Sequence, residues 1–177
     1  MTIVDGVRRL HIGADERREG WEVFNIIPSS IVDHVGDARD LSRFQDATFA
    51  ELYASHVLEH FDYIDEIANA LQEWKRVLVP GGRLYISVPN LDVLCFLFSH
   101  EDVTSLEDKY TIMRLMFGGH MTRYDHHKSG LFPELLTRYL HDAGFEGVTT
   151  EDDFGLFKDS SVIKCAGISI SLNMLAY

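Results

Sequence analysis

The sequence predicts an α/β domain built on a mainly parallel sheet, with residues 1–177 forming one unit. Apolar strand-like segments alternate with amphipathic helical segments through the middle of the chain, an order typical of parallel sheets. The clearest example is the strand–helix–strand unit between Phe49 and Asn90. A length of 177 residues, 46% of them hydrophobic, suits one core of ordinary size. No linker or internal repeat divides the chain.

Three short strands are expected before this unit, at residues 8–12, 21–27 and 31–35. Each has an apolar or β-rich composition and stops at a glycine, proline or aspartate that favours a turn. The polar segment 14–20 connects the first two strands, and residues 40–46 form a loop before the central unit begins.

The central unit carries the strongest secondary-structure signals. Residues 49–55 are apolar or small almost throughout, as expected for a strand buried on both faces. The helix that follows has acidic residues near its start and Lys75 and Arg76 near its end, and both placements complement the helix dipole. Pro-Gly-Gly at 80–82 is predicted to terminate this helix, and residues 83–88 to form the next strand. The predicted apolar stripe consists of Ile64, Ile67, Leu71, Trp74 and Leu78.

The last part of the chain continues the alternation of helices and strands. Helices are expected at residues 91–98 and 102–116, and Pro133 opens a further helix at its first turn. Residues 120–130 form a polar loop that carries three histidines. The closing strands are residues 148–152 and 166–177.

Charge and cysteine content exclude several classes of protein. Sixteen basic against 28 acidic residues give a formal net charge of −12, which disfavours a nucleic-acid partner. No apolar run approaches the roughly 20 residues of a membrane helix, and no signal-peptide pattern is visible. Cys95 and Cys165 lie far apart in apolar surroundings, as reduced cysteines often do. We therefore expect a cytoplasmic protein with no membrane span.

Four turns are candidate ligand-binding positions. In parallel α/β sheets, ligands bind outside the carboxyl ends of the strands, near the point where the strand order reverses. The carboxyl ends of the first four predicted strands, together with the turns that follow them, contain Gly13, Asn25, Asp37 and Ser55. We expect these turns to line one ligand site.

These turns and their flanking segments resemble the class I S-adenosylmethionine-dependent methyltransferases, most closely the type 11 branch often found with polysaccharide and lipopolysaccharide genes. The resemblance rests on Leu-His-Ile-Gly-Ala-Asp at 10–15, Ala-Ser-His-Val-Leu-Glu-His at 54–60 and Arg-Val-Leu-Val-Pro-Gly-Gly at 76–82, and it includes Phe-Gly-Gly at 117–119. It implies a Rossmann-like, three-layer α/β/α fold with an antiparallel C-terminal strand. It also implies S-adenosylmethionine as cofactor, and methyl transfer to a sugar, a polysaccharide precursor or another small hydroxylated acceptor.

The resemblance further implies which residues meet the cofactor, and two of them depart from the family pattern. Ala14 stands where the family has a second glycine, and Asn25 stands where the family has an acid that accepts from the ribose. Losing one charge-assisted hydrogen bond costs roughly 1–3 kcal/mol. A non-catalytic relative with a degenerate cofactor loop is therefore the alternative. The implied contacts are Gly13, Ala14 and Asp15 for the methionine part, Asn25 and Ile26 for ribose and adenine, Asp37 and Ala38 for adenine, and Ser55, His56 and Val57 beside the sulfonium.

A hydroxyl acceptor also needs a general base, and histidine suits this role near neutral pH. The resemblance places His60 near the substrate, and the family often builds its acceptor site in the loop after the fifth strand. The candidates for catalysis are therefore His60, His120, His126 and His127, with solvated loop residues as the competing interpretation.

Residues 56–60, His-Val-Leu-Glu-His, also match the H-x-x-E-H pattern of inverted zinc peptidases. A zinc hydrolase with His56 and His60 as ligands is the less favoured alternative, because the motif directly follows a strand and no third ligand is recognisable. We therefore expect no metal site. Glu59 fits a carboxylate at a helix start as well as it fits a role in a site. The expected partner is a small-molecule or glycan acceptor, and a homodimer is one option for the assembly.

Overall fold

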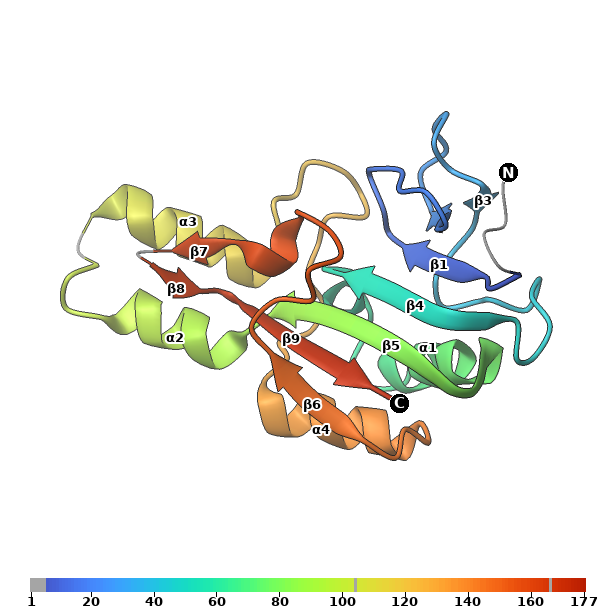
Figure 1. Ribbon diagram of the computed structural model, residues 1–177. Coiled ribbons are helices and arrows are strands. Elements are labelled where there is room, and N and C mark those ends of the chain that lie inside the picture. The colour runs from blue at the N-terminus through green and yellow to red at the C-terminus, as the bar shows by residue number, and fades with distance from the viewer. Residues whose placement is uncertain (1–5, 104, 166) are drawn as a thin grey trace.

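The structure is a computed structural model that describes residues 6–103, 105–165 and 167–177. Its centre is a seven-stranded sheet in the order β3-β2-β1-β4-β5-β9-β6 (Figure 1). β9 runs antiparallel to its neighbours β5 and β6, and the other pairings in this sheet are parallel. The predicted fold class is therefore confirmed. The strands are β1 (Arg9–Ile12), β2 (Glu22–Asn25), β3 (His34–Val35), β4 (Phe49–Ser55), β5 (Leu78–Pro89), β6 (Val148–Glu151) and β9 (Ser171–Ala176).

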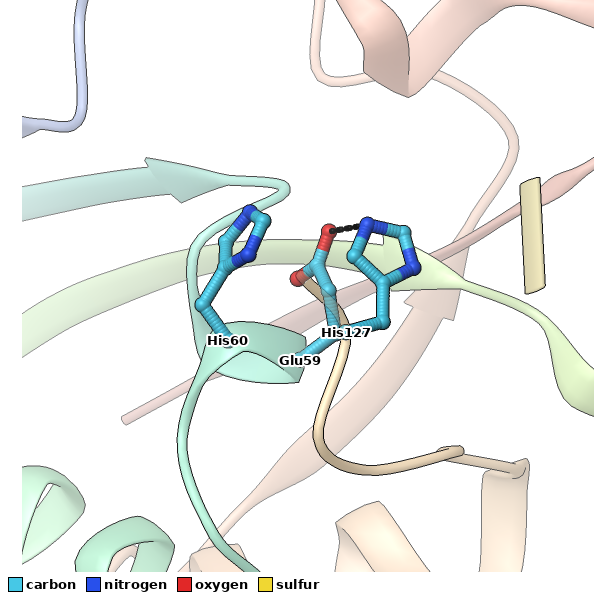
Figure 2. Close-up of side chains that lie close together, drawn as sticks. All are labelled: Glu59, His60 and His127. Carbon is cyan, nitrogen blue, oxygen red and sulfur yellow. Dashed lines mark ion pairs between the residues drawn. The ribbon is translucent and has the colours of Figure 1, made fainter. Parts of the chain in front are cut away.

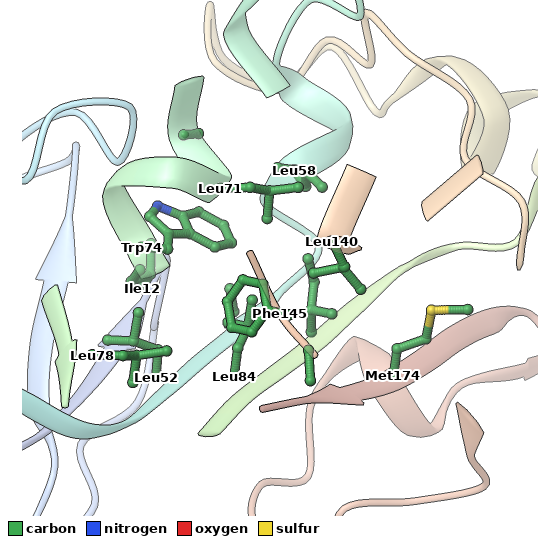
Figure 3. Close-up of a cluster of buried hydrophobic side chains, with 14 of the residues drawn as sticks. Ile12, Leu52, Leu58, Leu71, Trp74, Leu78, Leu84, Leu140, Phe145 and Met174 are labelled. Carbon is green, nitrogen blue, oxygen red and sulfur yellow. The ribbon is translucent and has the colours of Figure 1, made fainter. Parts of the chain in front are cut away.

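One face of the sheet carries the main hydrophobic core. Side chains alternate between the two faces along a strand, and Leu52 of β4 and Leu84 of β5 both belong to this core. They pack in one cluster with Trp74 of α1 (Glu66–Val77) and with residues of α4 (Pro133–Asp142) (Figure 3). Because a buried leucine contributes roughly 1.5–3 kcal/mol, this layer holds the strands in register.

The opposite face of the sheet is covered by a loop segment. As far as the structure describes it, its apolar cluster contains residues of a loop and none of an α-helix. Tyr53 of β4 packs there against Phe157 of segment 152–163. The Tyr53 hydroxyl donates to Asp159 Oδ2 at 2.9 Å, and η2 (Ser160–Val162) lies in the same segment. Segment 152–163 thus covers the face of the sheet where the predicted α/β/α arrangement has a helical layer.

A helical lobe extends beyond the carboxyl end of β5 (Figure 1). It consists of α2 (Leu91–Ser99), α3 (Leu106–Phe117) and the short strands β7 (Lys164–Cys165) and β8 (Ile168–Ser169). In the described ranges, none of the helices combines the length and apolar character that a membrane crossing requires. The buried residues of the lobe are Leu94, Leu97, Ile112 and Ile170.

The central helix is shorter than predicted at both ends. Ile64 precedes α1 and is 79% exposed, and Leu78 has an extended backbone and begins β5, so neither belongs to the apolar stripe of the helix. The Asp62 side chain accepts a hydrogen bond from the Ile64 N–H at 2.8 Å. Such a local turn competes with helix formation, which explains the later start of α1.

Residues 80–82, Pro-Gly-Gly, lie within β5 and do not terminate the helix, so this prediction is wrong. A Cβ on Gly82 would lie 2.9 Å from the carbonyl oxygen of Val79, so glycine allows the strand to bend there. The predicted strand 166–177 is divided into β8 and β9, and Ala166 lies outside the described residues.

Candidate active site

A first cavity lies at the carboxyl ends of β1, β2 and β4, where parallel sheets bind ligands. Its volume is about 370 Å³, within the range of roughly 300–1,000 Å³ typical of small-molecule sites. Its walls are completed by residues 36–39, which follow β3, and by residues of the segment 120–130, which we call the histidine-rich loop. Among the residues expected to meet a cofactor, those that line it are Gly13, Asn25, Ile26, Asp37, Ala38, His56 and Val57.

The other three residues of the cofactor prediction lie beside this cavity and do not line it. Ala14 is 3% exposed, and its carbonyl oxygen accepts a hydrogen bond from Asn25 Nδ2 at 2.9 Å. Asp15 is exposed on the turn after β1. The Ser55 hydroxyl is buried and has no hydrogen-bond partner among the described residues. Adjacent side chains at the end of a strand point in different directions, so only some of them reach the cavity.

Gly13 brings the ends of two strands together. Its φ is +81°, in the left-handed region that favours glycine, and its N–H donates to the Phe24 carbonyl oxygen at 2.8 Å. A Cβ at this position would lie 2.5 Å from Val57 Cγ2. The first turn can therefore pass close to the end of β4 only because residue 13 has no side chain.

Two polar residues that line the first cavity, Asn25 and Asp37, already have hydrogen-bond partners within the chain. The Asp37 carboxylate accepts from Arg39 Nε at 2.9 Å and from Arg39 Nη2 at 2.5 Å, and these hydrogen bonds lower the pKa of Asp37. Arg39 also contacts Glu66. Asn25 donates to Ala14, as described, and its Oδ1 accepts from the Ile27 N–H at 2.9 Å.

A second cavity of about 420 Å³ adjoins the first. Thr111 and Arg114 of α3 and Ser160 of η2 give it polar groups that can hydrogen-bond a hydroxylated molecule. The residues that line both cavities are His56, His60 and Asp125. We call the boundary formed by these three residues, together with Glu59 and His127, the shared wall.

His56 lies at the end of β4 in a strained conformation. Its φ is +54°, a value that costs a non-glycine residue roughly 1–3 kcal/mol and is concentrated at functional sites. Its Nε2 lies 2.9 Å from Ser171 Oγ, whose own proton is donated to the Ser160 carbonyl oxygen at 2.8 Å. Nε2 of His56 must therefore be the donor, which leaves its Nδ1 unprotonated in the neutral ring.

The histidine-rich loop is attached to η1 (Leu58–His60) by hydrogen bonds to backbone carbonyl oxygens. The Lys128 N–H donates to the Glu59 carbonyl oxygen at 2.8 Å, and His60 Nδ1 donates to the His126 carbonyl oxygen at 3.1 Å. Gly118, with φ +90°, permits this return, because a Cβ there would lie 2.5 Å from the Asp125 carbonyl oxygen. These contacts place His127 beside η1.

Glu59 is the most deeply buried acid of the shared wall, at 1% exposure. Its side chain lies between those of His60 and His127 (Figure 2). Its Oε1 lies 3.5 Å from His56 Nδ1 and 3.9 Å from His127 Nε2. Neither of its carboxylate oxygens has a hydrogen-bond partner among the described residues. Burial raises the pKa of Glu59 to about 8 and lowers the pKa values of His56 and His127 to about 4.

The sequence and the structure match known methyltransferases. The family model described as a methyltransferase domain matches residues 13–86, which contain β2 to β4, the helix α1 and most of β5. No curated protein matches the sequence. A SAM-dependent methyltransferase from Archaeoglobus fulgidus superposes with a TM-score of 0.62 at 17% identity, over 98% of this chain and 87% of the other.

Two further solved structures give the same result. The CurJ carbon methyltransferase superposes with a TM-score of 0.56 at 16% identity, over 97% of this chain and 48% of the other. The trans-methyltransferase CalH, in complex with SAH, superposes with a TM-score of 0.57 at 17% identity, over 97% and 51%. This chain therefore spans about half the length of these two proteins.

This chain has the class I methyltransferase fold. The matched family model covers residues 13–86, and the solved neighbours, at 16–17% identity, share the fold. The residues of the first cavity fit S-adenosylmethionine, since Gly13 lines it without a side chain and Ile26 and Ala38 offer apolar contacts.

The four histidines predicted for catalysis occupy different places in this methyltransferase fold. His60 lines both cavities, His126 lines the first and His127 lines the second. His120 lines neither. Its ring stacks on that of His126 at 4.0 Å, and its Nε2 donates to the Phe117 carbonyl oxygen at 2.9 Å.

The sequence leaves the role of Glu59 open and does not indicate that polar side chains of α3 line the second cavity. The only signal for Glu59 was its place between two histidines at 56–60, whereas Thr111 and Arg114 carried none. The H-x-x-E-H segment does not place its histidines on one α-helix, because His56 directly follows β4 and residues 58–60 form a 3-10 turn. The helix-borne zinc pair of the hydrolase alternative is therefore not formed.

Proposed function

We propose that this chain transfers a methyl group from S-adenosylmethionine to a hydroxyl of a small-molecule acceptor, such as a sugar or polysaccharide precursor. One observation carries the proposal: two adjacent cavities share a wall that contains His56, His60 and Asp125. A transfer between two bound molecules needs such an arrangement, because alignment and exclusion of water supply most of the catalysis.

In this proposal, the first cavity holds the cofactor. Its Gly13 turn would accept the amino-acid part, Ile26 and Ala38 would contact the adenine, and Asn25 and Asp37 would offer polar contacts. When bound, S-adenosylmethionine supplies a methyl group made electrophilic by a sulfonium.

The second cavity would hold the acceptor. Arg114, Thr111 and Asp125 suit a molecule with several hydroxyl groups, such as a sugar. The attacking hydroxyl loses a proton during transfer, and we assign its acceptance to the shared wall, where His60 faces both cavities. A cytoplasmic location, a role in polysaccharide biosynthesis and a homodimeric assembly remain predictions.

A non-catalytic relative is the second candidate, and one observation favours it. The polar groups of Asn25 and Asp37 that would bind ribose and adenine already hydrogen-bond to Ala14, Ile27 and Arg39. A cofactor must compete with these hydrogen bonds, which weakens its affinity.

Thermal unfolding with S-adenosylhomocysteine tests cofactor binding. At 100 times its Kd, a ligand stabilises the folded state by about 2.7 kcal/mol, which raises Tm by about 5–10 °C for a domain of this size. Ile26→Ala removes an apolar contact and should weaken binding by about fivefold to tenfold. Ile64→Ala, an exposed control outside both cavities, should leave the affinity unchanged.

Transfer itself is measured by the release of S-adenosylhomocysteine with a panel of sugars and sugar nucleotides. Product formation that depends on the acceptor supports the methyltransferase. Tight binding without transfer would support the non-catalytic relative. No shift in Tm at millimolar S-adenosylhomocysteine would reject cofactor binding at the first cavity.

A further inference from the structure

The shared wall brings together one carboxylate and three imidazoles. Glu59, His60 and His127 each offer one ligand atom, and these three atoms lie within 4.8 Å of one another (Figure 2). His56 lies beside this group, with its Nδ1 at 3.5 Å from Glu59 Oε1. All four residues line the second cavity.

The hydrogen bonds behind the rings decide which nitrogens are free. His60 Nδ1 contacts the His126 carbonyl oxygen at 3.1 Å, and His127 Nδ1 contacts the Met116 carbonyl oxygen at 3.2 Å. Because a carbonyl oxygen only accepts, both Nδ1 atoms carry the proton. Nε2 of His60 and of His127 is therefore unprotonated in the neutral rings, as is Nδ1 of His56.

This arrangement is the one that proteins use to hold a metal ion. Histidine ligands almost always donate their second ring N–H to a carbonyl or carboxylate, which sets the tautomer and the ring orientation. Here the unprotonated nitrogens of His60 and His127 and the carboxyl group of Glu59 converge, and Glu59 is 1% exposed with no hydrogen-bond partner among the described residues. Electron pairs that face one another repel unless a proton or a metal cation lies between them.

We propose that Glu59, His60 and His127 bind one divalent transition-metal ion of the zinc type, which leaves the fourth position of a tetrahedral site open. Imidazole nitrogens favour zinc and neighbouring transition metals, whereas magnesium and calcium favour sites made of oxygen atoms. At a Zn–N distance of about 2.1 Å, tetrahedral ligands lie roughly 3.4 Å apart, so the side chains close in slightly on binding. This proposal replaces the expectation from sequence that there is no metal site.

The position of the metal suggests what it would bind. All of its ligands line the second cavity, so an open coordination position there would face an acceptor oxygen. A metal-bound hydroxyl loses its proton more readily, and His60 would then be a ligand instead of the proton acceptor. This role rests on the proposed function, but metal binding itself does not.

Zinc titration of tag-free protein, first treated with chelator and then dialysed, tests the site. Calorimetry and elemental analysis should find one zinc per chain with a Kd below about 1 μM, and cobalt should give the visible absorption of a tetrahedral site. Glu59→Gln and His127→Ala should each weaken binding at least a hundredfold. His100→Ala, at the end of α2 and outside both cavities, should bind as the unaltered chain does.

The alternative is that Glu59 is a neutral carboxylic acid that donates to His56. In that case the unaltered chain would bind zinc no better than Glu59→Gln, which would overturn the proposal. Circular dichroism checks that each variant folds, and His60→Gln replaces any variant that does not. Zinc binding without a Tm shift from S-adenosylhomocysteine would support the metal site and reject cofactor binding. A Tm shift without zinc binding would reject the metal site and leave the proposed function intact.

Discussion

Gly13 and Ala14 show how one glycine can serve where related loops have two. Gly13 alone has the left-handed backbone and the close approach to Val57. Ala14 has no positive φ and is buried beneath the turn, so its methyl group packs where a second glycine would leave space. The departure at residue 14 is therefore compatible with an open first cavity.

We expect Gly13→Ala to destabilise the fold more than the control Gly144→Ala. Both glycines have a positive φ, which costs an alanine roughly 1–2 kcal/mol. Only at Gly13 does the new Cβ also collide, with Val57 Cγ2 at 2.5 Å, whereas nothing lies within 4 Å at Gly144. Overpacking adds about 1–3 kcal/mol. Urea unfolding measures both values, and equal losses would contradict the close packing at Gly13.

His11 should make the protein sensitive to mild acid. Burial lowers its pKa from 6.5 to about 4, so the folded state holds a neutral ring beside Tyr53 and Phe157. Below pH 6.5 the unfolded chain binds a proton that the folded chain does not, so stability falls between pH 6.5 and about 4.

His11→Phe keeps a ring in this cluster and removes the titrating group. The stability of the variant should therefore fall less over this pH range, by up to about 3 kcal/mol relative to the unaltered chain. Urea unfolding at pH 7, 5.5 and 4 measures the difference. Parallel curves for both proteins would show that His11 does not titrate in this way.

At the scale of single elements, β4, α1 and β5 were predictable because their signals are local. The apolar composition of residues 49–55 matches β4 residue for residue, and the helical repeat identified the buried face of α1. The exact start of α1 depends on the Asp62 turn. The bend at 80–82 depends on the close approach of Gly82 to the backbone of β4. Such boundaries follow from single hydrogen bonds and from close packing with another strand, which periodicity does not encode.

Segment 152–163 is an element that sequence patterns did not reveal, and we expect it to be held by Tyr53. The Tyr53 hydroxyl donates to Asp159, which also accepts from the Ser161 N–H at 2.9 Å. Tyr53→Phe and Asp159→Ala should each cost about 1–3 kcal/mol, because each leaves a polar group without its partner.

A double-mutant cycle tests this attachment. If the hydroxyl and the carboxylate interact directly, the double variant should lose about 1–2 kcal/mol less than the sum of the single losses. Tyr85→Phe is the matched control, since its hydroxyl contacts Glu51. Additive losses for Tyr53 and Asp159 would mean that the segment is held by its apolar contacts alone.

At the scale of the whole molecule, the site consists of parts that lie far apart in the sequence. The ends of β1, β2 and β4 supply the first cavity, and the shared wall adds η1, the histidine-rich loop and, through Ser171, the start of β9. The loop bonds to the backbone of Glu59 in η1, and its return there requires the glycines at 118–119, where a Cβ would collide with Asp125. The geometry of the wall therefore depends on the complete sheet.

The sheet, its main helical layer and the strand ends where a ligand would bind are predictable from the sequence, because strand composition, helical periodicity and glycine positions act over a few residues. Two features appear only in the folded chain: Glu59 and His127, 68 positions apart, share one wall, and a loop covers the second face of the sheet. These features depend on backbone hydrogen bonds and burial between distant segments, and no local pattern specifies such contacts.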